Sequence, residues 1–191
     1  MPDRFRLCLF LGLILSLPQA LVAEAAVDRD PCPSPGTVAV RDDGVRLIFA
    51  GEDPDEPGLC LVRIGEHTQR LLFGFWAPIG PDIEEHRSAL AQLLSGGPGT
   101  RVTISEHVFT DAWVEIWERG GEELVTLRNG ARRAIRMERM MRLSGPTSFA
   151  ARATYWIDSD TGVVLKARHQ HIEGLKLPYR DIAITHLDMR G

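Results

Sequence analysis

Short segments in which apolar and polar side chains alternate recur along most of the chain, and turns rich in glycine or aspartate separate them. This period-two pattern predicts half-buried β-strands, and the close spacing of the segments predicts antiparallel hairpins. The expected strands are residues 37–40, 45–50, 59–64, 68–76, 101–105, 112–119, 122–128, 132–143, 149–157, 162–172 and 179–187. The sequence therefore predicts a mainly β protein with an antiparallel meander sheet that can curl into a half-barrel.

One segment, residues 82–95, has helical periodicity instead. Asp82 can cap its first turn, and Glu85 three residues later completes a capping box. Its apolar residues on one face are Ile83, Leu90, Leu93 and Leu94. The glycine-rich and proline-containing residues 96–99 end the pattern. We therefore expect one helix, which follows a small N-terminal β unit and precedes the meander.

The first 25 residues have the composition of a secretory signal peptide. Arg4 and Arg6 precede an apolar run at residues 7–17, and residues 23–25 fit the small-x-small cleavage pattern. We expect cleavage after Ala25 and a periplasmic or secreted protein without a transmembrane span, because the apolar run is short for one. An uncleaved N-terminal anchor is the alternative.

Removal of these 25 residues from the 191 leaves 166, a length that suits a single domain. We expect the N-terminal β unit at residues 26–80 and the helix with the meander at residues 81–191, and the two can form one domain together. The formal net charge is −4. Such a charge has no basic excess of the kind that indicates nucleic-acid binding.

Two cysteines, Cys32 and Cys60, remain after the expected cleavage. Exported chains meet an oxidising compartment, so we expect these two to form a disulfide bond. The closed loop of about 29 residues would stabilise the fold by roughly 3–4 kcal/mol on the chain-entropy model. Two free thiols or a metal-binding pair are the alternatives, and no histidine or cysteine at ligand spacing supports the second.

Alternation in the last strands predicts one apolar face that also carries polar groups. In the register we expect, the facing pairs are Leu165 with Tyr155, Ala167 with Ala153, His169 with Ala151, and His171 with Phe149. Arg139 falls on the same face, opposite Ala153. The small side chains leave room there, so Arg139, His169 and His171 could bind a carboxylate or phosphate, while the apolar face near Tyr155 takes a hydrophobic tail.

Three other interpretations of this face stay open. The histidines can lie at a strand end in water, Arg139 can extend to the rim, or the helix can fill the face. A metal site has less support, because two histidines one residue apart supply two ligands and zinc needs three or four. We therefore predict no metal and no cofactor.

The stretch around Gly120-Gly121 predicts a second surface feature. A two-residue turn at these glycines would place Val125 opposite Ile116 on the apolar face, and a three-residue loop at 129–131 would continue that register. Trp113 and Trp117 would then share the opposite face. Either the N-terminal β unit covers these tryptophans, or they form an aromatic patch that binds a partner.

The sequence contains none of the motifs G-x-S-x-G, H-E-x-x-H or G-x-x-x-x-G-K. Our first hypothesis is therefore a non-enzymatic envelope protein that binds a lipid or an amphipathic small molecule. The alternatives are a protein-interaction module of the cell envelope, which uses Trp113 and Trp117 or an open sheet edge, and a hydrolase with an unrecognised site.

Two motifs carry a resemblance to known proteins. Tyr155-Trp156, Gly162, Val164 and Lys166, together with the preceding residues 125–139, resemble an exported proteobacterial β-domain of unknown function. The earlier stretch departs from that pattern, because Arg132 stands where an aromatic residue is usual and Arg136 replaces a lysine. The meander is more loosely similar to the lipoprotein-carrier half-barrels of the LolA type, and that similarity implies acyl chains held on a concave apolar face.

Overall fold

The computed structural model describes residues 31–77, 83–108, 111–145 and 148–189. The expected signal peptide and its cleavage site, and the expected cap at Asp82, lie outside the described residues. The strands are β1 (Val38–Arg41), β2 (Arg46–Glu52), β3 (Leu59–Ile64), β4 (His67–Leu72), β5 (Arg101–Val108), β6 (Asp111–Leu127), β7 (Gly130–Ser144), β8 (Phe149–Asp158), β9 (Val164–Gly174) and β10 (Ile182–Asp188). Within the described part of the chain, the single helix is α1 (Ile83–Ser95).

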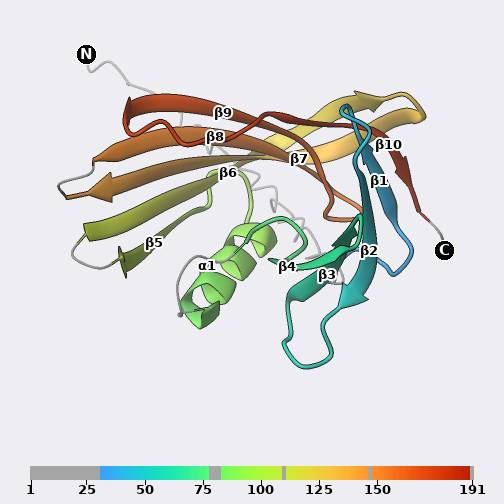
Figure 1. The fold of residues 1–191 in the computed structure, drawn as a ribbon, viewed down its shortest axis with the longest axis horizontal. Helices are drawn as coiled ribbons and strands as arrows, with labels where there is room; N and C mark the ends of the chain where they lie inside the picture. The colour runs from blue at the N-terminus through green and yellow to red at the C-terminus, as the bar shows by residue number, and fades with distance from the viewer. Residues whose placement is uncertain (1–30, 78–82, 109–110, 146–147, 190–191) are drawn as a thin grey trace, which may run out of the picture.

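All ten strands form one antiparallel sheet in the order β4-β3-β2-β1-β10-β9-β8-β7-β6-β5. The sheet is strongly curved and stays open, with β4 and β5 at its two edges (Figure 1). Strand β1 pairs with β10, so the N-terminal hairpins continue the sheet that the meander begins. The predicted fold class, a mainly β antiparallel meander with one helix, is confirmed.

Helix α1 connects the two edge strands and lies in the concavity of the sheet (Figure 1). Leu90 and Leu93 on its apolar face are completely buried, as the helical periodicity predicts. They join the main core, whose other buried members are Leu59, Leu72, Phe73, Trp76, Val102, Ile104, Trp113, Trp117, Ile135, Met137, Met141, Phe149, Ala151, Ala153, Tyr155, Ile157 and Ala167. The helix therefore fills much of the inner face of the sheet.

A second core joins β1–β3 and β10 to the distal part of the β6–β7 hairpin and to the start of β9. Its buried members are Ala39, Phe49, Val62, Leu127, Ala134, Val163, Leu165, Ile184 and Leu187. The predicted disulfide bond between Cys32 and Cys60 is present, with a Cα–Cα distance of 5.3 Å. It ties the chain that precedes β1 to β3, as expected.

Strand β6 differs from the prediction, because Gly120 and Gly121 lie within one continuous strand and form no turn. Strand β6 pairs with β7 on both sides of the glycines, and the register shifts between Arg119 and Glu122, so the glycines form a β-bulge. A tight two-residue hairpin turn needs positive φ angles, and neither glycine has one. Bulges also favour glycine, whose missing side chain permits close approach of the partner strand.

The predicted three-residue loop at 129–131 is also wrong. Leu127 pairs directly with Gly130, so the hairpin turn contains only Arg128 and Asn129. Val125 consequently faces Arg132 and neither Ile116 nor Ile135. The alternation of β6 is thereby inverted: Trp113, Glu115 and Trp117 point inward, and Ile116 lies on the outer face.

Candidate ligand-binding site

Strands β8 and β9 carry most of the predicted site residues. Ala153 pairs with His169 and Ala151 with His171, two residues away from the predicted register. The extra residue Leu165 at the register shift between Trp156 and Ile157 accounts for one of the two residues, and the pairing of Ile157 with Val164 in place of Val163 accounts for the other. A shift of two residues keeps each side chain on its face, so both histidines still follow the inner face of the sheet.

The small side chains of this face do not leave the room that we predicted around them. Ala151, Ala153 and Ala167 are buried, and Ala153 is in the main core. The aromatic rings of Tyr155 and Trp117 stack beside them, with their centroids 5.5 Å apart. Aromatic side chains and the helix therefore fill the centre of the concave face, which is one of the alternatives that the sequence left open.

Arg139 lies in this centre and forms an ion pair with Glu115. Both side chains are buried, at 6% and 0% exposure, and Arg139 Nε donates a hydrogen bond of 2.9 Å to Glu115 Oε2. Arg139 Nη2 also bonds Glu115 Oε1. The remaining lone pairs of Glu115 accept hydrogen bonds from the indole N–H groups of Trp113, at 2.8 Å, and Trp117, at 2.9 Å. A buried carboxylate with four donors is fully satisfied.

This ion pair changes the role of Arg139. Burial alone would lower the pKa of Arg139, but the adjacent Glu115 carboxylate outweighs burial and raises the pKa above its ordinary value. The guanidinium also lies 5.1 Å from the centroid of the Trp117 ring. Its charge is therefore neutralised inside the protein. Arg139 contacts Tyr155, whose ring packs against His169. Sequence reasoning missed Glu115 because the inverted register of β6 placed it on the outer face.

A chain of contacts leads from this buried centre to the rim of the sheet. Arg139 Nη1 donates a hydrogen bond of 3.4 Å to the hydroxyl of Tyr155. The Tyr155 ring meets His169 edge to face at 6.0 Å, and His169 stacks on Tyr179 with ring centroids 5.1 Å apart. His169 therefore lies between two tyrosines, where the core ends.

His169 is held through its backbone, and its ring nitrogen Nδ1 lies 3.9 Å from Asp181 Oδ1. Its backbone N–H donates a hydrogen bond of 2.8 Å to Asp181 Oδ1, while its buried Nδ1 has no hydrogen-bond partner among the described residues. Burial lowers the pKa of His169 below 6.5, and the positive charge of Arg139 lowers it further, whereas Asp181 opposes the shift. The imidazole is therefore neutral at pH 7 and can accept or donate one hydrogen bond.

Next to His169 a small hollow opens at the rim, with a volume of about 80 Å³. Its lining residues are Phe149, Ala151, His169, Gln170, His171, Lys176, Leu177 and Tyr179. They come from β8, from β9, and from residues 175–181, which run back along β9 towards β10 and which we call the return segment (Figure 1). The hollow thus combines apolar walls with two histidines, a lysine and a tyrosine.

The structure brings part of the predicted site to this hollow. Ala151, His169 and His171 line it, and His171 is exposed at its rim. Arg139 and Tyr155 lie behind His169, and Ala153 is packed away in the core. The return segment supplies Lys176, Leu177 and Tyr179, which sequence reasoning missed. Their only signal was a short alternation of apolar and basic residues, which gave no indication that the segment folds back under the sheet.

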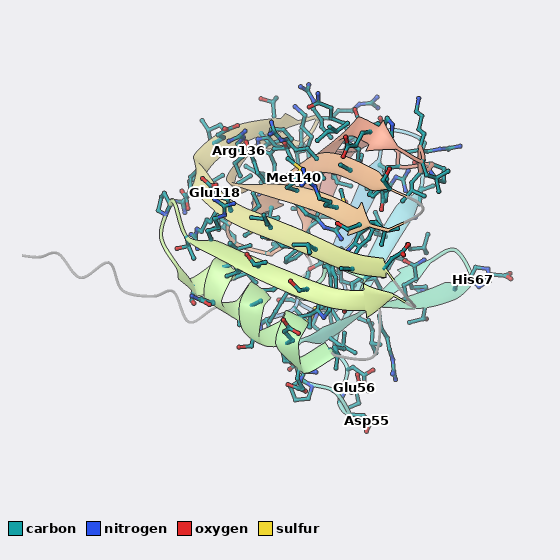
Figure 2. All side chains as sticks on the ribbon, turned by 90° about the vertical axis from the view of Figure 1, so that its left-hand side faces the viewer. Asp55, Glu56, His67, Glu118, Arg136 and Met140 are labelled. Carbon is teal, nitrogen blue, oxygen red and sulfur yellow. A yellow bond between two sulfur atoms is a disulfide. The ribbon has the colours of Figure 1, made fainter. Side chains whose placement is uncertain are left out.

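A second hollow, of about 310 Å³, lies on the outer face of the sheet. Its lining residues are Arg101, Ile116, Glu118, Glu138, Arg139, Met140 and Arg152. Figure 2 shows Glu118 and Met140 on this face, on the side of the sheet away from α1. Basic and acidic side chains alternate around two apolar ones, so this hollow favours no single charge of ligand.

Among the described residues, His67 and His86 lie in different parts of the molecule. His67 lies at the turn between β3 and β4, far out from the body of the molecule (Figure 2). His86 is buried below the stacked ring of Trp76, and its Nε2 lies 2.9 Å from Glu106 Oε1. Among the residues that the structure describes, no group of three or more metal-binding side chains forms a site. No helix among these same residues has the length and apolar character needed to cross a membrane.

Trp113 and Trp117, the residues predicted to contact a partner, are 7% and 0% exposed. Trp113 stacks on Phe149 at 5.7 Å, and Phe75 packs against the edge of Trp117 at 6.1 Å. Both tryptophans belong to the core, so neither is available to a partner. An interaction module would therefore have to use one of the open sheet edges, β4 or β5.

Comparison with known proteins gives distant likenesses only. No family model matches the chain, and no curated protein matches it. The hypothetical lipoprotein YmcC of Escherichia coli K12 is similar in structure at a TM-score of 0.45 and 14% identity, over 72% of this chain and 80% of that one. A Bacteroides fragilis protein with a YmcC-like fold, thought to be exported, is similar at a TM-score of 0.36 and 11% identity, over 82% of this chain and 97% of that one. Likenesses at this level assign no family and no activity.

Proposed function

We propose that the protein is exported to the periplasm or secreted, and that it binds an amphipathic small molecule without catalysis. The hollow at the rim between β8, β9 and the return segment is the binding site. One observation carries the proposal, namely that basic and apolar side chains line the same hollow. The N-terminal residues with the composition of a signal peptide support export.

The polar end of the ligand is an anionic carboxylate or phosphate. Lys176 supplies a positive charge, and His171 at the exposed rim supplies a further hydrogen-bond donor. The neutral ring of His169 lies deeper and can donate one N–H to the same group. Arg139 adds a positive charge behind His169, although Glu115 neutralises it locally. This arrangement favours an anion over a cation.

The apolar end of the ligand lies against Phe149, Leu177 and Ala151. A hollow of about 80 Å³ accommodates a head group or a few carbon atoms, and it cannot enclose a complete acyl chain. The binding mode therefore differs from that of the carrier half-barrels, which hold acyl chains along the whole concave face. Most of a longer tail would stay at the surface beside the return segment.

Isothermal titration of the signal-free protein with decyl phosphate, decanoate and decyl maltoside tests the proposal. We expect saturable binding of one or both anions and none of the neutral maltoside. Combined substitution His171→Ala and Lys176→Ala should weaken binding about tenfold, a loss of roughly 1.4 kcal/mol. Arg168→Ala is the matched control, because it removes a positive charge from an exposed position on the other face of β9.

Two results would contradict the proposal. One is the absence of saturable binding of either anion. The other is an equal affinity in the double variant and the wild type, since the basic residues of the hollow would then have no part in recognition. Comparison of decanoate with decyl phosphate also shows which anion the site prefers.

A further inference from the structure

Three exposed arginines form a diagonal line across the outer face of the sheet. They are Arg142 on β7, Arg152 on β8 and Arg168 on β9, and we call them the arginine diagonal. Arg152 pairs with Met140, two residues before Arg142, and Arg168 pairs with Thr154, two residues after Arg152. Paired residues of neighbouring strands share a face, and each diagonal step spans about 7–8 Å. Figure 2 shows Met140 on the side of the sheet away from α1, so the whole line lies there.

The charges of the arginine diagonal are not neutralised by the part of the chain that the structure describes. All the ion pairs formed there involve other basic side chains. Two nearby acids are already matched, because Glu138 bonds Arg136 and Glu118 faces Arg101 across the strands. Glu173, at the end of β9, adds one negative charge beside three positive ones. The surface therefore keeps a positive line that no ion pair within the described chain balances.

We propose that the arginine diagonal binds an extended acidic segment of another polypeptide. Alternate side chains of an extended chain point to the same side and are separated by about 6.6–6.8 Å, twice the rise per residue. Carboxylates on every second residue therefore match the step of about 7–8 Å between neighbouring arginines. Each guanidinium can hold one carboxylate through two parallel N–H groups, which makes arginine more selective for this partner than lysine.

A narrow, linear partner fits this surface better than a broad one. Glu118 and Glu138 lie on one side of the arginine diagonal, and Glu173 lies on the other. A flat array of phosphates, such as a membrane surface, would meet these acids together with the arginines. A long nucleic acid would extend past the line over a protein whose formal net charge is −4. A short extended segment meets the three arginines alone.

The inference goes beyond the proposed function, because the arginine diagonal and the hollow beside His169 lie on opposite faces of the sheet. A ligand with a single anionic group, such as decyl phosphate, engages one exposed arginine at a time. One exposed ion pair contributes little to binding, whereas an acidic segment forms three such pairs together. Decyl phosphate is therefore expected in the hollow and not on the outer face, so the two sites can be tested separately.

Titration of the isotope-labelled, signal-free protein with two synthetic peptides, followed by amide chemical shifts, tests the inference. In one peptide glutamate and threonine alternate. In the other, of the same composition, the glutamates form one block, so only half of them point to the same side. We expect saturable shifts along the arginine diagonal with the alternating peptide, weaker binding of the block peptide, and loss of binding as the salt concentration rises.

Two triple variants supply the matched comparison. Arg142→Gln/Arg152→Gln/Arg168→Gln should weaken binding of the alternating peptide about tenfold, because it removes three exposed ion pairs. The control carries the same change of charge at exposed arginines on β2, on β3 and in the β6–β7 turn, Arg46→Gln/Arg63→Gln/Arg128→Gln. It should bind like the wild type. These surface substitutions should leave thermal unfolding nearly unchanged.

The inference is overturned if the alternating peptide does not bind saturably, if the block peptide binds equally well, or if both triple variants lose affinity equally. Phosphatidylglycerol vesicles and an oligothymidylate test the other polyanions. Tighter binding of either one through the same arginines would overturn the assignment to a polypeptide. Both triple variants should bind decyl phosphate like the wild type, so failure of the arginine diagonal and failure of the hollow are distinguishable.

Discussion

The residue that organises the inner face is Glu115. Its carboxylate joins Arg139 from the neighbouring strand to the indoles of Trp113 and Trp117, so one buried group fixes three other side chains. A buried ion pair is costly to form, and it persists only when its hydrogen bonds are complete. Here they are complete, and the network holds Tyr155 and, through it, His169 at the edge of the hollow.

Substitution of Glu115 with alanine leaves Arg139 as an unpaired buried charge. We expect the free energy of unfolding to fall by about 3–5 kcal/mol. Glu118→Ala, on the same strand but exposed on the outer face, should change it by less than about 0.5 kcal/mol. Urea denaturation of the two variants checks the comparison, and similar midpoints would show that the buried network contributes little.

Glu115 also illustrates a limit of prediction from sequence. Alternation correctly placed Arg139, Tyr155 and His169 on one face, because a register error of two residues does not exchange faces. The wrong loop at 129–131 shifted the expected pairing of β6 with β7 by an odd number of residues, so the side chains of β6 were assigned to the wrong face. The sequence therefore carried no indication that Glu115 pairs with Arg139, because Glu115 was assigned to the opposite face.

At the scale of elements, the return segment depends on the turn that begins it. Gly174 has a φ of 75°, and a Cβ at this position would collide with the carbonyl group of Ser148. Leu175 N–H donates to the same Ser148 carbonyl oxygen at 3.2 Å. The sequence predicted that β9 ends near this glycine. Where the chain goes next depends on tertiary packing of Leu177 and Tyr179, for which local patterns carry no signal.

Gly174→Ala should therefore displace the return segment. Gly44 is a suitable control, because its φ of 83° is similar but a Cβ there would meet nothing within 4 Å. We expect Gly44→Ala to cost roughly 1 kcal/mol through backbone strain alone, and Gly174→Ala to cost more, up to about 3 kcal/mol. Amide hydrogen exchange at His169 should quicken only in the second variant. Equal behaviour of the two variants would show that the turn is not crowded.

Asp158, the last residue of β8, should make the stability of the fold depend on pH in acid. Asp158 is buried and accepts hydrogen bonds of 2.8 and 3.0 Å from Arg132, and others from Thr161. Burial alone would raise the pKa of Asp158, but these bonds outweigh burial and lower the pKa below 3.8. A carboxylate with a lowered folded-state pKa stabilises the fold at pH values above 3.8, and this stabilisation is lost as the pH falls through the lowered value.

Asp158→Asn should remove this contribution. At pH 7 we expect the variant to be less stable than the wild type by about 2 kcal/mol, the range for hydrogen bonds to a charged group. The difference should shrink as the pH falls below 3.8, because the carboxylate of the unfolded wild type then binds a proton and that of the folded protein follows at its lowered pKa. Urea denaturation at pH 7 and pH 3 measures it, and a difference that stays constant with pH would contradict this account.

At the scale of the whole molecule, the described strands form a single open, curved sheet (Figure 1). Strand β1 lies beside β10, and helix α1 crosses the concavity between the edge strands β4 and β5. Consecutive hairpins were predictable from turn signals, since each involves only local residues. The pairing of β1 with β10 was not, because it joins segments more than a hundred residues apart and depends on closure of the second core.

The disulfide bond contributes to stability at this scale. It joins residues separated by 28 positions, so its reduction should lower the free energy of unfolding by roughly 3–4 kcal/mol on the chain-entropy model. Urea denaturation with and without a thiol reductant measures the effect. The variant Cys32→Ser/Cys60→Ser should behave like the reduced wild type and should not respond to reductant. An unchanged midpoint on reduction would show that the core alone fixes the N-terminal residues.

The central claim is that the hollow beside His169 binds an amphipathic anion. Titration of the isotope-labelled protein with decyl phosphate, followed by amide chemical shifts, tests it most directly. The account predicts saturable shifts at the residues that line the hollow, Ala151, His169, His171, Lys176, Leu177 and Tyr179, with the outer face around Ile116 and Met140 unaffected. Shifts that centre on the outer face, or that rise linearly without saturation, would contradict it.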